Sequence, residues 1–239
     1  MNVDLFRVAA QRNEVAVLGY EARRARGPCI VAGHGYSSSK HNLDFLCGFL
    51  ASHGYGVFSL DFPGHKLGAS GGVLRGVEDL VDAMSAVVTY VRERYDGPVY
   101  AMGHSMGAMT ALFTAAADPG IAGTIAIAAG YGRPTAIDAL QGKVTADFRS
   151  SYVDGLNLLD LVRGVEGRYD AALARLAGRP QLYVAADRDA MVDRRSLEAL
   201  YARAPDPKRY ALISSDHTYA GENARTEVLQ WLNERHPRD

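Results

Sequence analysis

The chain contains 239 residues, of which 48% are hydrophobic and 22% charged, as is typical of a globular protein and unlike a disordered or fibrous chain. Lys and Arg number 26 and Asp and Glu number 27, so the net charge is −1. No excess of positive charge is available to bind a polyphosphate, which argues against a nucleic-acid partner.

The N-terminal segment and the cysteines indicate where the protein works. Charged residues such as Asp4 and Arg7 interrupt the N-terminal segment, so no signal-peptide core is expected there. The longest apolar stretch, residues 121–131, is far shorter than the ~20 residues of a membrane-spanning helix. Cys29 and Cys47 have no C-x-x-C spacing and are expected to be reduced core residues. We therefore expect a cytoplasmic protein with no membrane partner.

Eight short apolar runs predict β-strands. The first two, residues 3–8 and 14–20, indicate an antiparallel hairpin at the edge of a sheet. The other six lack strict alternation of polar and apolar residues, which is typical of strands buried on both faces. These six span residues 29–32, 56–60, 99–102, 124–128, 182–185 and 210–213.

Longer segments with helical periodicity alternate with these strands. In residues 77–95, for example, Leu80, Met84 and Val87 recur at spacings of three and four. The full set of predicted helices is 43–53, 77–95, 106–117, 168–177, 194–203 and 223–235. Strands that alternate with helices form β-α-β units. We therefore predict an α/β fold, with an eight-stranded, mostly parallel sheet covered by helices on both faces.

One segment, residues 131–167, lacks sustained periodicity. A stretch of this length without regular structure is uncommon in a compact domain and is usually functional. We interpret it as a lid inserted over one end of the sheet, too short to form a domain of its own. Residues 1–239 are then expected to form a single domain.

A G-x-S-x-G pentapeptide, Gly103-His104-Ser105-Met106-Gly107, lies between a predicted strand and a predicted helix. This context distinguishes a nucleophile elbow from a chance match. A serine on so sharp a turn crowds its neighbours two positions away on either side, so only small residues fit there. The start of the helix also directs free N–H groups to the same point. We predict that Ser105 is a nucleophile.

A serine nucleophile needs a base, and His217 has the right position for that role. Six of the seven histidines lie within or before the elbow, in a helix or in the C-terminal tail. His217 follows the last predicted strand, and ligands of open parallel sheets bind at the carboxyl ends of strands. The carboxylate that orients the base should also follow a strand. Asp187 and Asp189 both do so, whereas Asp193 opens the next helix and is expected to cap it.

These motifs resemble the α/β-hydrolase superfamily over nearly the whole chain. The matching segments are the elbow, the loop His34-Gly35-Tyr36, the turn from Asp61 to His65, the turn from Asp187 to Val192, and Asp216-His217. The resemblance implies that Asp189, the second aspartate of a D-x-D-x-x-V turn, is the acid of the triad. It also implies that Asp187 holds its loop together by accepting hydrogen bonds from backbone N–H groups.

The resemblance also implies an oxyanion hole formed by the backbone N–H groups of Tyr36 and Met106, with His34 bracing the loop. The Tyr36 phenol is a further candidate substrate contact. The run from Gly64 to Ser70 is two residues longer than the D-x-x-G-H-G-x-S pattern of many relatives. The extra residues are expected to alter the rim of the pocket.

A triad with an oxyanion hole implies acyl transfer, and we predict hydrolysis of carboxylic esters with short-to-medium acyl chains. The insertion is similar in size to the small lids of carboxylesterases and feruloyl-type esterases. Tyr152, Leu156 and Leu159 are candidates to line its acyl pocket. A small-molecule ester is the expected partner. Neither an organic cofactor nor a metal is expected, because the sequence has no dinucleotide fingerprint after the first core strand and no cluster of metal ligands.

Alternatives with the same triad are an acyl-CoA thioesterase, a C–C bond hydrolase, an amidase or peptidase, and a non-catalytic ligand-binding member of the fold. A dehalogenase is disfavoured because that branch uses an aspartate nucleophile. A thioesterase that acts on CoA would benefit from a basic rim around its pocket. The candidate arginines for such a rim are Arg163, Arg168, Arg188, Arg194 and Arg195.

Overall fold

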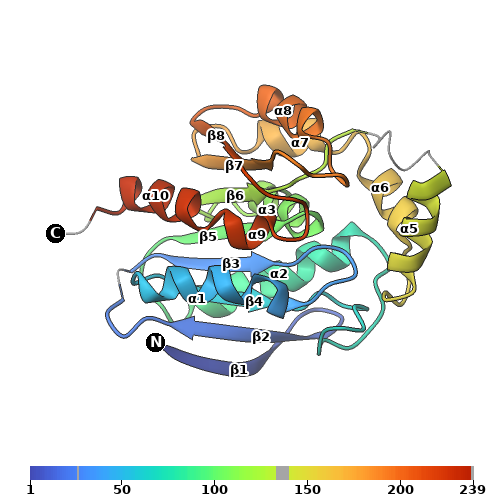
Figure 1. Cartoon of the computed structure of the whole chain (residues 1–239). Helices are drawn as coiled ribbons and strands as arrows, with labels where there is room; N and C mark the ends of the chain where they lie inside the picture. The colour runs from blue at the N-terminus through green and yellow to red at the C-terminus, as the bar shows by residue number, and fades with distance from the viewer. Residues whose placement is uncertain (26, 133–139, 238–239) are drawn as a thin grey trace.

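The computed structural model describes residues 1–25, 27–132 and 140–237. Within these residues the chain forms an eight-stranded sheet with the order β1-β2-β4-β3-β5-β6-β7-β8 (Figure 1). The strands are β1 (Asn2–Ala9), β2 (Glu14–Glu21), β3 (Cys29–Gly33), β4 (Gly56–Leu60), β5 (Val99–His104), β6 (Gly123–Ile127), β7 (Gln181–Ala186) and β8 (Lys208–Ile213). β2 pairs antiparallel with β1 and β4, and the other neighbours are parallel. The predicted sheet with a hairpin at its edge is confirmed.

Helices cover both faces of the sheet (Figure 1). They are α1 (Asp44–Ser52), α2 (Val77–Arg92), α3 (Met106–Ala117), α5 (Leu140–Ser150), α6 (Leu158–Val165), α7 (Tyr169–Ala174), α8 (Arg194–Arg203), α9 (Ala220–Asn223) and α10 (Arg225–Arg235), and a 3-10 turn, η1 (Lys40–Leu43), precedes α1. The predicted last helix, 223–235, corresponds to α10, and the short helix α9 precedes it, the two meeting at Ala224. None of the described helices is both long and apolar enough to span a membrane.

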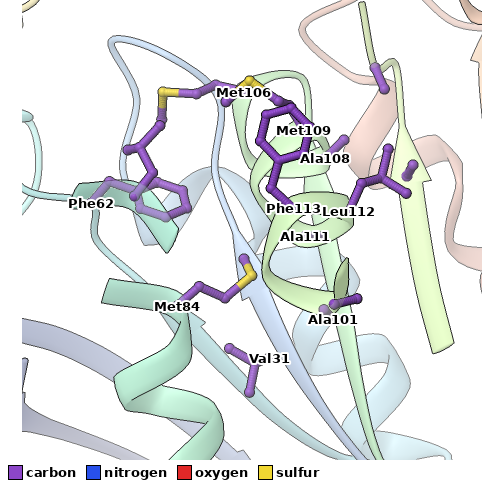
Figure 2. Close-up of a cluster of buried hydrophobic side chains, with 14 of the residues drawn as sticks. Val31, Phe62, Met84, Ala101, Met106, Ala108, Met109, Ala111, Leu112 and Phe113 are labelled. Carbon is purple, nitrogen blue, oxygen red and sulfur yellow. The ribbon is translucent and has the colours of Figure 1, made fainter. Parts of the chain in front are cut away.

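Two hydrophobic cores lie on the two faces of the sheet. The side chains of adjacent residues on a strand point to opposite faces. Val31 of β3 accordingly belongs to the core beneath α2, α3 and α8, while Ile30 and Ala32 belong to the core beneath α1 and α10. Figure 2 shows part of the first core, including Val31 and Met84 of α2. Because β3 is fully buried on both faces, its sequence reads as a continuous apolar run.

The predicted insertion contains two helices joined by a non-helical segment, which corrects the expectation of an irregular segment throughout. It contains α5 and α6, and residues 133–139 lie outside the described part of the chain. In α5 the large apolar side chains Val144 and Phe148 are more than 60% exposed and do not face the core. The helix therefore did not require an apolar stripe that the sequence would show. Only Leu161 and Val165 of α6 are buried in the core, and they span a single helical turn.

The insertion is fastened to the extended loop that follows β4. Isolated β-bridges join His65 to Val153 and Leu74 to Gly155. The residues by which this loop exceeds the family pattern therefore lie beside the insertion, and the two segments together form the wall above the carboxyl ends of the strands (Figure 1).

Candidate active site

Ser105 occupies a strained turn between β5 and α3. Its backbone has φ 54° and ψ −116°, a region that L-residues rarely adopt. The Ser105 N–H donates to the carbonyl of Ile127 at 2.8 Å, which ties the turn to the end of β6. The surrounding structure therefore holds the serine in a conformation that the isolated chain would avoid.

The two glycines of the pentapeptide are required by close contacts. A Cβ atom on Gly103 would lie 2.1 Å from the carbonyl carbon of Gly107. A Cβ atom on Gly107 would lie 2.0 Å from the carbonyl oxygen of Gly33 on β3. Both distances are far inside van der Waals contact, so α3 approaches β3 this closely only because glycine occupies these positions.

His217 and Asp189 form a buried, hydrogen-bonded pair. His217 lies in the loop after β8 and Asp189 in the loop after β7, and Nδ1 of the histidine is 2.7 Å from Oδ2 of the aspartate. Oδ1 of Asp189 accepts hydrogen bonds from the N–H groups of Met191 and Val192 at 2.9 and 2.8 Å. Burial raises the pKa of Asp189, but these hydrogen bonds and the contact with His217 outweigh it, so the pKa lies below its ordinary value. An ionised Asp189 accepts from Nδ1–H, which leaves Nε2 of His217 to act as a base.

The other two aspartates of this region have different partners. Oδ1 of Asp187 accepts from the N–H of Ser215 at 2.9 Å, which joins the loop after β7 to the loop after β8. Asp193 accepts from the N–H of Arg195 at 3.0 Å and caps α8. The structure therefore places Asp189, and not Asp187, against His217.

Met106 and Tyr36 both line the space beside Ser105. Met106 is the first residue of α3, and the first N–H groups of a helix have no intrahelical acceptor. Tyr36 lies in the loop that follows β3 and lines both cavities at the serine. Its phenol donates to the carbonyl of Leu156 at 2.9 Å, so this group braces the insertion.

A buried polar network holds the loops around Tyr36. Nε2 of His34 accepts from the N–H of Phe62 at 3.0 Å, so His34 links the loop after β3 to the loop after β4. Nζ of Lys40 lies 2.6 Å from Asp61, whose carboxylate also accepts from the N–H groups of Lys40 and Ala69. Burial raises the pKa of Asp61, but its hydrogen bonds hold the pKa below the usual value.

Two cavities meet at Ser105. The apolar cavity has a volume of about 330 Å³, and its walls include Met109, Leu158, Leu161, Val165 and Tyr169. The second cavity has a volume of about 270 Å³ and contains more polar side chains than the first, so we call it the polar cavity. Its walls include Ser37, Ser38, Asn42, Arg149, Tyr152 and His217, together with the apolar Leu67 and Phe148. Ser105, Tyr36, Leu158 and Met191 line both cavities.

The predicted substrate contacts are distributed unevenly over these cavities. Tyr152 lines the polar cavity, and Leu158 lines both. Among the described residues that line the two cavities, Leu156 and Leu159 are not found. Leu158 recurs with Leu161 and Val165 at spacings of three and four, so the apolar face of α6 is the signal that distinguishes Leu158 from Leu159. Met191 was also missed, because it lies in a loop with no periodic pattern.

The arginines considered for a basic rim are mostly engaged elsewhere. Arg163 pairs with Asp160, Arg168 with Glu78, and Arg194 with Glu198. Arg188 lies 3.6 Å from its neighbour Asp187. The arginine that lines the site is instead Arg149, for which the sequence contains no local signal. In the part of the chain that the structure describes, no group of three His, Cys, Asp or Glu side chains could hold a metal ion.

The sequence model of the alpha/beta hydrolase family matches residues 29–236, and the chain therefore belongs to this family. Among curated proteins, none matches the chain.

Solved structures share the fold at low sequence identity. The α/β hydrolase GrgF from Penicillium sp. sh18 has a TM-score of 0.77 and 15% identity, with 99% of each chain covered. Est1E from Butyrivibrio proteoclasticus, solved with ferulic acid bound, has a TM-score of 0.74 and 16% identity over 98% of this chain and 100% of that one. The thioesterase domain from the curacin biosynthetic pathway has a TM-score of 0.69 and 16% identity over 96% and 98%. At these identities the likeness shows the fold alone.

We expect the substitution Gly107→Ala to destabilise the protein by ~3 kcal/mol, because α3 would have to move away from the Gly33 carbonyl. Gly164→Ala is the matched control. Gly164 lies in α6 with no atom within 4 Å of an added Cβ, so alanine there should be neutral or stabilise by up to ~1 kcal/mol. Urea unfolding followed by circular dichroism measures both. Equal free energies of unfolding for the two variants would contradict the close contact.

Stability should fall in acid because of His104. This residue is buried beside His217, with its Nε2 on the His217 carbonyl at 2.8 Å, and burial, followed by the charge of His217, lowers its pKa to about 3. In the unfolded chain the His104 imidazole takes up a proton near pH 6.5, whereas in the folded protein it stays neutral down to about pH 3. The stability that neutral His104 gives the folded protein is therefore complete above pH 6.5 and is lost as the pH falls toward 3. Between pH 4.5 and 5.5, His104→Gln should reduce the slope of the unfolding free energy by about 1.4 kcal/mol per pH unit. Urea titrations at several pH values measure the slope, with the exposed His41→Gln as control. An unchanged slope in His104→Gln would refute the assignment.

Proposed function

We propose that the protein is a serine hydrolase that cleaves carboxylic esters of short-to-medium acyl chains. The observation that carries the proposal is that His217, held by Asp189 at 2.7 Å, lines the same cavity as Ser105 on its strained turn. A nucleophile, a base and a group that orients the base are the three parts that acyl transfer requires.

In the proposed first half-reaction, Oγ of Ser105 attacks the acyl carbon and its proton passes to Nε2 of His217. The negative charge that develops on the acyl oxygen is stabilised by the N–H groups of Met106 and Tyr36, each contributing ~3 kcal/mol. Asp189 stabilises the imidazolium. When the tetrahedral intermediate collapses, the ester C–O bond breaks and the leaving oxygen takes the proton from His217, which leaves an acyl group on Ser105.

In the second half-reaction, a water molecule attacks the acyl group while its proton moves to His217. Collapse of this second intermediate returns the proton to Oγ of Ser105 and releases the carboxylic acid. The chain thus returns to its starting protonation state, and its own side chains carry every proton that moves.

The apolar cavity supports the choice of acyl group. Its volume of about 330 Å³ is near the lower end of the range of ligand pockets, ~300–1,000 Å³, and its walls are largely aliphatic and aromatic. A short-to-medium acyl chain fits such a space. Structural neighbours titled as esterases, including the Pyrococcus furiosus esterase Pf2001, agree with ester hydrolysis, while the neighbour titled as a thioesterase makes thioesters the alternative to test.

Ser105→Ala should abolish hydrolysis of p-nitrophenyl butyrate, with a loss of kcat that can reach ~10⁶ when a triad member is removed. A p-nitrophenyl panel of different chain lengths, with butyryl-CoA beside it, separates ester from thioester hydrolysis and locates the preferred acyl length. In the parent protein, a serine-directed organophosphonate should label the peptide that contains Ser105 in a one-to-one ratio. Full activity in Ser105→Ala would exclude this serine as the nucleophile.

Asp189→Asn should lower kcat by ~10⁴, because an amide favours the wrong His217 tautomer and does not stabilise the imidazolium. Asp187→Asn is the matched control. The asparagine oxygen can still accept from the N–H of Ser215, so the loop should hold its shape and the activity should change little. Steady-state kinetics on the same ester measures both variants. The reverse order of damage would assign the acid to Asp187.

A further inference from the structure

Arg149 lies in the wall of the polar cavity beside the proposed catalytic residues. It comes from the C-terminal turn of α5, is half-buried, and lines the same cavity as Ser105 and His217. Its Nη1 donates to the Tyr36 carbonyl and to the Ser37 hydroxyl, both at 3.4 Å. These contacts are long, so they hold the guanidinium in place without saturating its five donors.

No carboxylate in the described part of the chain forms an ion pair with Arg149. The other arginines near the insertion, Arg163 and Arg168, each lie within 3.0 Å of a carboxylate oxygen. Burial lowers the pKa of Arg149, and its positive charge is among the influences that lower the pKa of His104, after burial and the charge of His217. A half-buried, unpaired guanidinium is unfavourable unless an anion completes it. Its planar donors match a carboxylate or a phosphate.

The position of His217 indicates which part of the substrate meets Arg149. His217 lines the polar cavity, whereas the described walls of the apolar cavity do not include it. Because the histidine must give its proton to the leaving oxygen, the leaving group lies on the histidine side of Ser105. The acyl group then occupies the apolar cavity, and the alcohol occupies the space lined by Ser37, Asn42 and Arg149.

We propose that the preferred substrates are esters of an apolar acid with an alcohol that carries an anionic group, a carboxylate or a phosphate, which Arg149 binds. This inference rests on the proposed function and specifies its substrate class. Arg149 then sets specificity on the leaving-group side, while Ser105, His217 and Asp189 carry the bond cleavage.

The experiment compares butyrate esters that differ only in the charge of the leaving group. 3-Hydroxybenzoate provides a carboxylate, 3-hydroxyphenyl phosphate provides a phosphate, and 3-hydroxybenzamide is the neutral match. We expect kcat/KM of the parent protein to be about tenfold higher for an anionic ester than for the amide, because one partly solvated, charge-assisted hydrogen bond contributes about that factor. A preference for either anion supports the proposal and identifies the group.

Variants on the insertion test the role of the arginine. Arg149→Gln should remove the anionic preference while hydrolysis of the neutral ester continues, and Arg149→Lys should retain part of the preference. Arg163→Gln is the matched control, because Arg163 is an exposed arginine of α6 that pairs with Asp160. A preference that survives in Arg149→Gln would overturn the proposal. So would a stronger preference for an ester with the anion on its acyl side, such as the mono-4-nitrophenyl ester of succinic acid.

Binding measurements separate this proposal from the proposed function. Calorimetry with the intact esters and the Ser105→Ala protein, with and without Arg149→Gln, reports recognition without turnover. Tenfold tighter binding of an anionic ester that depends on Arg149 supports the inference, and equal binding of the charged and neutral esters overturns it. If the parent protein hydrolyses neither ester and no organophosphonate labels Ser105, the proposed function fails, and the binding result still decides the role of Arg149.

Discussion

The close approach of α3 to β3 is the constraint on which the site depends. The two segments come together at Gly107, where any side chain would meet the Gly33 carbonyl. This contact places the start of α3 directly over the sheet, so Ser105 is forced into its strained turn and the first N–H groups of the helix face the cavity. Ten of the twelve residues of α3 are buried, and their packing holds this arrangement against the strain.

The remaining parts of the site are loops that follow different strands, and polar contacts join these loops in pairs. The buried Lys40–Asp61 pair and the hydrogen bond from Phe62 to His34 join the loops after β3 and β4. Asp187, which is exposed, joins the loops after β7 and β8 by accepting from the N–H of Ser215. A buried charge that loses its partner is costly, so the Lys40–Asp61 pair restricts the loops after β3 and β4 most strongly. The pair of His217 and Asp189 forms only because both loops are held in this way.

The two cavities give the site a direction. One is walled largely by aliphatic and aromatic side chains, whereas the other combines hydroxyl, amide and guanidinium groups with apolar side chains such as Leu67 and Phe148, and Ser105 lies between them. The insertion contributes to both, since Leu158 of α6 lines each cavity and Arg149 of α5 lines the polar one. In the proposed reaction the same segment would shape the space for the acyl group and for the leaving group. Isolated β-bridges join the insertion to the long loop after β4, so the walls of both cavities are connected to the sheet through that loop.

The sequence by itself determined those features whose signals are local. Strands buried on both faces leave continuous apolar runs, and the elbow leaves a fixed glycine spacing around Ser105, so fold and nucleophile could be predicted from neighbouring residues. Asp187 and Asp189 follow the same strand, so the pattern of strands did not separate them, and the choice of Asp189 rested on the resemblance to the family. The tertiary structure placed Asp189 against His217. It also brought Arg149 to the cavity and showed that Leu158, and not Leu159, lines it. Leu158, Leu161 and Val165 have helical spacing, but a helix of 8 residues shows this pattern over only two turns. Arg149 belongs to no apolar pattern, so its place beside the site depends on how the insertion packs over the sheet.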